Sequence, residues 1–168
     1  MRWVDTGFAT IFTSLASNNL DMVAAAATIT PERQQTVSFS NPYFLVNQSL
    51  TVNVAKTPAI TSTDGLGSGM VVAAQSGTTG ASWAKENLLP KGVQLKSFNL
   101  STDMYTELAA GKVTGVINDE PASRAEVAGL PDLKAVNDAL DRIIADGTYA
   151  KIFTKYFPGV GVPPQFQQ

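Results

Sequence analysis

Hydrophobic and polar residues follow different patterns in two successive blocks of the chain. Near the start, apolar residues recur at spacings of three, four and seven, which predicts an amphipathic helix over 8–15. The next apolar run, 20–27, has the length of a buried strand, although its four alanines are poor strand formers. The helical stripe consists of Phe8, Ile11, Phe12 and Leu15.

A short helix is predicted after Thr30 and Pro31, because threonine caps helices and proline fits their first turn. That turn would carry Arg33. Residues 49–55 alternate in polarity, which predicts a strand that closes the first block. From 57 to 69 the chain is rich in Thr, Ser, Gly and Pro, a composition typical of a connector between lobes.

The second block repeats strand and helix in turn, which indicates an α/β sheet with helices on its faces. Gly111 follows one of these helices, where a helix end favours left-handed backbone. Farther along, apolar stripes predict a long amphipathic helix over 133–144 and a second helix over 149–157. The alternating elements are strands at 70–74, 93–98 and 113–118 and helices at 81–88, 101–110 and 120–127.

Composition and charge narrow the chemistry. The 168 residues are 44% hydrophobic and 15% charged, and the net charge is −2. These values exclude a disordered chain and a large basic surface for nucleic acid. Because the chain has no cysteine and no histidine, thiol nucleophiles, Ser-His-Asp triads, disulfides and Cys- or His-ligated zinc are excluded. We expect neither a cofactor nor a metal.

Arg33 is a candidate anion-binding residue. It follows an apolar run and lies in the first turn of a predicted helix, where a guanidinium and backbone N–H groups could bind a carboxylate. The alternative is a solvated surface residue that pairs with Glu32 or with nothing.

Two further candidates lie in the second block. The glycine-bearing loop 75–80 could direct its amides at an anion, or it could be an ordinary strand-to-helix turn. Asp119 follows strand 113–118 at its carboxyl end, where ligands collect in α/β sheets, or it could merely cap the following helix. Together with Arg33, these features suit a zwitterion held between two lobes.

Several motifs, in order along nearly the whole chain, resemble the extracellular solute-binding proteins for polar amino acids that supply ABC importers. The most specific is Thr-Ile-Thr-Pro-Glu-Arg at 28–33, followed by Ser-Asn-Pro-Tyr-Phe at 40–44. The remaining motifs are found at 19–23, 75–80, 107–112 with Asp119, and 145–152.

The resemblance implies an α/β fold with the periplasmic-binding-protein-like two-lobe architecture of type II. It places a first-lobe segment at 1–56, a hinge at 57–69 and a second lobe at 70–130. Residues 131–157 would form C-terminal helices that pack on the first lobe, and 158–168 a tail. Against the family pattern, an N-terminal unit of about 40 residues and a return strand near 128–133 are missing, so we expect an incomplete first lobe.

The resemblance also implies roles for individual residues. Arg33 would be the bidentate partner of the ligand's α-carboxylate, helped by the backbone amide of Thr79 in the opposite lobe. Thr28 and the carbonyl group of Ala26 would share the α-ammonium with Asp119.

Three more positions match residues that line the cleft in relatives. Phe8 matches an aromatic residue that packs on the ligand's side chain, although its spacing also suits an ordinary core residue. Gln75 and Thr78 line the cleft and could touch the ligand.

We therefore expect a non-enzymatic protein that binds a polar or cationic L-amino acid for the membrane subunits of an ABC importer. Two alternatives stay open: a dehydratase-like enzyme that uses Glu120 beside Asp119 as paired acids, and the sensory domain of a receptor. If the chain is complete as printed, an exposed strand edge predicts a homo-oligomer or exchanged segments.

The resemblance also implies a location. We expect the periplasm, or the outer face of a Gram-positive cell through a lipid anchor. The first residues lack the apolar core of an export signal.

Overall fold

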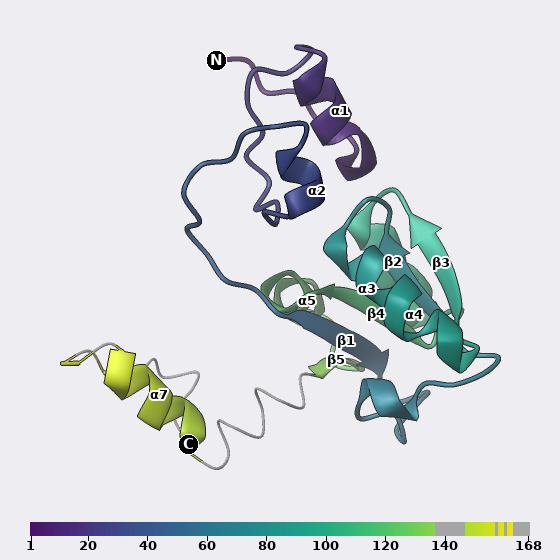
Figure 1. The fold of residues 1–168 in the computed structure, drawn as a ribbon. Coiled ribbons are helices and arrows are strands. Elements are labelled where there is room, and N and C mark those ends of the chain that lie inside the picture. The colour runs from purple at the N-terminus through teal and green to yellow at the C-terminus, as the bar shows by residue number, and fades with distance from the viewer. Residues whose placement is uncertain (137–146, 157, 160, 163–168) are drawn as a thin grey trace.

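The computed structural model describes residues 1–136, 147–156, 158–159 and 161–162. Figure 1 shows a sheet with helices on its faces, an N-terminal part that carries α1 and α2, and a separate C-terminal helix, α7. Among the described residues, no helix combines the length and the apolar character that crossing a membrane requires.

A five-stranded sheet forms the centre of the molecule, in the order β3-β2-β4-β1-β5. β2 pairs in parallel with β3 and with β4, as the strand-helix alternation predicts. β1 lies antiparallel between β4 and β5. The strands are β1 (Gln48–Asn53), β2 (Val71–Gln75), β3 (Gln94–Phe98), β4 (Gly115–Asp119) and β5 (Leu133–Val136).

Helices cover both faces of this sheet because successive strand residues point to opposite sides. On one side, Val72 and Ile117 pack in a buried cluster with Ala84 of α3 (Thr79–Asn87). On the other side, Val116 packs with Leu108 of α4 (Ser101–Ala110). The helix α5 (Glu120–Val127) lies against β4, β1 and β5 and follows β4 directly.

The N-terminal part, residues 1–47, is packed far less tightly. It contains η1 (Phe8–Thr10), α1 (Ile11–Ala16) and α2 (Pro31–Gln34), and Ile11 is its one buried residue. As predicted, Thr30 caps α2, and its hydroxyl oxygen accepts a hydrogen bond from the Arg33 amide at 3.2 Å.

Two secondary-structure expectations are wrong, and one strand is confirmed with the partners that the register shows. Residues 20–27 form no strand, since the alanine-rich run has weak strand propensity and pairs with no neighbouring strand. The strand predicted at 49–55 is confirmed as β1, which pairs with β4 and β5. Residues 133–136 form β5 and not a helix, because Leu133 and Ala135 are buried at the period-two spacing of a strand.

The remaining elements agree with the sequence where they can be compared. The connector carries the short η2 (Thr63–Gly65), η3 (Leu89–Lys91) follows α3, and α7 spans Thr148–Tyr156. Gly111 has the left-handed backbone expected of it, with φ +75°. The rest of the helix predicted at 133–144 lies outside the described residues. The packing of α7 on the N-terminal part and the lobe boundaries stay predictions.

Candidate functional site

Arg33 joins the N-terminal part to the turn between β2 and α3. Its guanidinium donates one hydrogen bond to the carbonyl oxygen of Thr28 at 2.7 Å and another to that of Gly77 at 2.9 Å. Arg33 is therefore not the free surface residue of the alternative interpretation. A guanidinium carries five N–H groups, so these two bonds leave donors for a further acceptor.

Two aromatic rings lie against this guanidinium. The ring centre of Phe12 lies 4.5 Å from the Arg33 guanidinium carbon and that of Phe8 lies 5.6 Å from it, both within cation-π range. Burial lowers the pKa of Arg33 below its ordinary value, while the negative charges of Glu32 and Asp119 act in the opposite direction. The site thus holds a partly desolvated cation within the electrostatic reach of Asp119.

The second half of the site lies where β1 begins and β4 ends. Gln48 is the strand partner of Asp119 in the antiparallel register. Its side-chain amide nitrogen donates to a carboxylate oxygen of Asp119 at 2.6 Å and to the hydroxyl oxygen of Thr79 at 3.3 Å. The Asp119 side chain makes no cap bond to α5, and its carboxylate is bonded to Gln48 instead.

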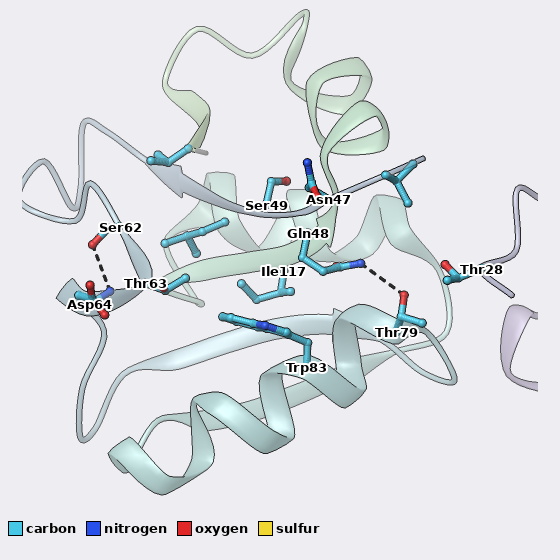
Figure 2. A pocket seen from close by; sticks show the side chains of 13 residues that line it. Thr28, Asn47, Gln48, Ser49, Ser62, Thr63, Asp64, Thr79, Trp83 and Ile117 are labelled. Carbon is cyan, nitrogen blue, oxygen red and sulfur yellow. Dashed lines mark hydrogen bonds between the residues drawn. The ribbon is translucent and has the colours of Figure 1, made fainter. Parts of the chain in front are cut away.

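A cavity of about 540 Å³ lies next to these residues, and it is lined by hydrogen-bond partners of Arg33 and Asp119 and not by these two residues themselves. Thr28 of the N-terminal part and Thr79 of α3 both line it, together with Gln48 and Trp83. Figure 2 shows Gln48 reaching from the sheet toward Thr79, with Thr28 nearby and the Trp83 ring along the cavity wall. The structure therefore brings Thr28, Thr79, Asp119 and Arg33 into one neighbourhood.

Of the site residues predicted from the sequence, only Thr28 and Thr79 line this cavity. Phe8 and Gln75 line a separate hollow of about 370 Å³, where the Gln75 amide donates to the Asn99 carbonyl oxygen at 2.9 Å. Thr78 caps α3 by accepting from the Ala81 amide at 3.2 Å. Its hydroxyl is therefore already engaged.

Ala26 borders a third hollow, of about 210 Å³, which Thr28 also lines. Its backbone has φ +47°, a left-handed conformation that L-residues other than Asn, Asp and His rarely adopt. Such strained positions cluster at ligand sites.

Glu120, the second carboxylate of the pair considered for acid-base work, is already engaged. Its carboxylate accepts a hydrogen bond from Arg124 one helical turn along α5. The described residues contain no group of three or more carboxylates that could hold a metal ion.

The sequence predictions missed Gln48, Phe12 and Trp83. A signal for Gln48 was present, because it stands two residues before Leu50 and therefore on the same face of β1. Its partner could not be foreseen without the pairing of β1 with β4.

Comparison with known proteins places the chain among binding proteins. The family model of the bacterial extracellular solute-binding proteins, family 3, matches residues 1–159, and the chain belongs to this family. The histidine-binding periplasmic protein of Escherichia coli (strain K12) is 26% identical over 187 residues, which cover 92% of this chain and 71% of that protein. The same values hold for the lysine/arginine/ornithine-binding periplasmic protein of that organism.

Solved structures that resemble this chain are also those of amino-acid-binding proteins. The ancestral amino acid-binding protein AncCDT-1, a precursor of cyclohexadienyl dehydratase, has a TM-score of 0.75 and 27% identity, covering 93% of this chain and 77% of its own. An ancestral arginine-binding protein bound to arginine has a TM-score of 0.71 and 29% identity, covering 93% and 80%. The expected periplasmic-binding-protein-like α/β fold is confirmed.

Proposed function

We propose that this protein binds a polar or cationic L-amino acid between its N-terminal part and its sheet, without chemical change, for delivery to an ABC importer. The names of its relatives support this class of ligand: they bind histidine, lysine, arginine, ornithine or glutamate. The observation that carries the proposal is the pair of opposite charges, Arg33 from one part and Asp119 from the other, whose hydrogen-bond partners Thr28 and Gln48 line one cavity.

A zwitterion fits this arrangement. The free N–H groups of Arg33 would bind the α-carboxylate, and Asp119 with the Thr28 hydroxyl would receive the α-ammonium. Each ion pair at contact distance is worth about 4 kcal/mol before desolvation at the dielectric typical of a protein surface. Two such pairs are needed because ordering the ligand and the two parts opposes binding.

Binding would also link the two parts of the molecule. Arg33 already contacts the turn that contains Gly77, so a ligand held by Arg33 and Asp119 would favour the arrangement in which both parts meet. A ligand shifts such an equilibrium by its differential affinity for the two states. A transporter could recognise the closed state through this shift.

Binding without turnover suits this site better than dehydration does. An enzyme would need a free general acid in the cleft, whereas the Glu120 carboxylate is held by Arg124. Absence of product from a prephenate-like acid, together with tight amino-acid binding, would exclude the dehydratase. We propose the periplasm or the outer cell face as the location, and the importer's membrane subunits as partners.

The test is calorimetric titration of the purified chain with the twenty amino acids. We expect at least one polar or cationic amino acid to bind, and Arg33→Ala or Asp119→Ala to weaken its binding by about 2 to 5 kcal/mol. The exposed Arg2→Ala and Asp103→Ala serve as charge-matched controls. No binding by the wild-type protein, or unchanged affinity in both site variants, would overturn the proposal.

A further inference from the structure

Gln48 has a position that no role assigned so far explains. It is the first residue of β1 and faces the same side of the sheet as Leu50, which packs in the cluster that includes Ala84 of α3. Asp119 stands opposite Gln48 in the register. The alternation of the two strands therefore directs both side chains toward the start of α3, where Thr79 lies.

The side-chain amide of Gln48 can face Asp119 in one orientation only. A carboxylate accepts hydrogen bonds, so the NH₂ group must point toward Asp119, and the same nitrogen reaches Thr79. The amide oxygen then lies on the far side, buried and without a hydrogen-bond partner among the described residues. A buried acceptor without a donor is unfavourable, so the contact with Asp119 must determine the orientation.

Gly80 provides the space for this arrangement. A Cβ atom at position 80 would lie 2.7 Å from the Gln48 amide oxygen, which is closer than such atoms can approach. The amide is therefore held between the Asp119 carboxylate on one side and the backbone of Gly80 on the other. Such a side chain has little freedom to rearrange.

We propose that Gln48 is a positioning residue that holds Asp119 and Thr79 together, so that the sheet presents its ammonium-binding and carboxylate-binding groups in one fixed geometry. Gln48 acts through Asp119 and does not itself recognise the ligand. Without it, the Asp119 carboxylate would lose the hydrogen bond that fixes its orientation. This inference rests on the proposed function.

The test compares amino acids with analogues that lack the amino group. The probes are L-arginine and L-glutamine, each with its desamino analogue, titrated calorimetrically into the full chain. We expect Gln48→Ala to reduce the preference for the amino acid over its analogue about tenfold, because the bond lost is a hydrogen bond to a charged group. Affinity for the desamino analogue should change far less, since Arg33 still binds its carboxylate.

A second variant, Gln48→Glu, is tested by the pH dependence of amino-acid affinity. This dependence would not change if Gln48 only filled space. Gln48→Glu places a carboxylate against Asp119, and the two acids would then share a proton. The second of their two ionisations is shifted upward, so amino-acid affinity should increase with pH between about 5 and 8 as the pair loses its shared proton. The wild-type protein and the control Gln94→Ala, an exposed glutamine at the start of β3, should show no such dependence.

The outcomes separate the two proposals. If the wild-type protein binds none of the twenty amino acids, the proposed function fails. If it binds but Gln48→Ala keeps the full preference for the amino group, or loses both ligands of a pair equally, the role of Gln48 is overturned. If Gln48→Ala does not fold by circular dichroism, the pH profile of Gln48→Glu decides, and a flat profile contradicts the inference.

Discussion

The N-terminal part and the sheet contribute to this molecule in opposite ways. Residues 48–136 contain nearly all of the buried core, including Leu108 and Val52 at 0% exposure. Residues 1–47 bury Ile11 alone and leave large apolar side chains in solvent, with Leu45 93% exposed. Yet this sparsely packed part supplies Arg33, the cation on which the proposed binding depends. Stability therefore comes mainly from the sheet region, whereas the proposed ligand binding needs both regions.

The two regions meet over a small area near one turn. Arg33 donates to the Gly77 carbonyl oxygen, and a Cβ atom at position 77 would lie 2.8 Å from the Cα atom of Ala9. Figure 1 shows α1 and α2 beyond the end of the sheet at which β2 leads into α3. We therefore expect substitutions to lower stability most in the core, less at this turn and least at the surface.

The largest effect is expected in the core of the sheet region. Leu108→Ala removes a fully buried side chain from the cluster with Met104 and Val116, and it should lower the free energy of unfolding by about 2 to 5 kcal/mol. Leu45→Ala, the same substitution in the N-terminal part, should change it by less than about 0.5 kcal/mol. Urea unfolding measures both, and equal losses would contradict the contrast between the regions.

A smaller loss is expected at the turn where the regions meet. Gly77 has φ +78° and Gly69 has φ +82°. Of these two positions, only position 77 would place a Cβ atom within 4 Å of other atoms. Gly77→Ala and Gly69→Ala should both show backbone strain of about 1 to 3 kcal/mol. Only Gly77→Ala should also separate the N-terminal part, which faster proteolysis within residues 1–47 would reveal. Identical digestion of the two variants would count against the contact.

At high pH, the sheet region should respond through Tyr105. Burial raises the pKa of its phenol above the ordinary value of 10.0, although hydrogen bonds with Ser123 and Asn118 act the other way. The stability that this group contributes is complete below pH 10 and declines as the pH rises beyond it. Tyr105→Phe should lose about 1 kcal/mol at neutral pH and flatten this alkaline decline. An unchanged decline in unfolding experiments would exclude Tyr105 as its source.

The smallest effect is expected on the sheet surface. Hydrogen bonds from Lys96 and Lys112 lower the pKa of Glu107. This contribution to stability is present above pH 4.5 and is lost as the pH falls through the lowered pKa. Glu107→Gln should remove that acidic slope, and added salt should weaken it in the wild-type protein. A slope that persists in Glu107→Gln would assign it to other carboxylates.

The same two regions explain how far the sequence alone could lead. Local patterns predicted the second block well, because each βαβ unit carries its own periodicity and its own end signals, as at Gly111. Residues 20–27 were predicted wrongly, since an apolar run becomes a strand only where another strand pairs with it. Residues 133–136 have apolar residues at the period-two spacing of a strand. The sequence predicted a helix there because apolar residues at helical spacing continue to residue 144.

The parts of the candidate site that the sequence indicated lie in short motifs. Arg33 with its threonine cap belongs to a single stretch, and so does the turn after β2. The bond between Gln48 and Asp119 joins residues 71 positions apart, and only the register of β1 against β4 brings them together. Pairing between distant strands is the information that composition and spacing do not contain.

The most direct test of the account is a crystal structure of the protein with L-arginine or with whichever amino acid binds best. We predict the α-carboxylate on the Arg33 guanidinium and the α-ammonium on the Asp119 carboxylate, with the Gln48 amide still bonded to Asp119. Density for the amino acid elsewhere, or contacts to only one of the two charges, would contradict it.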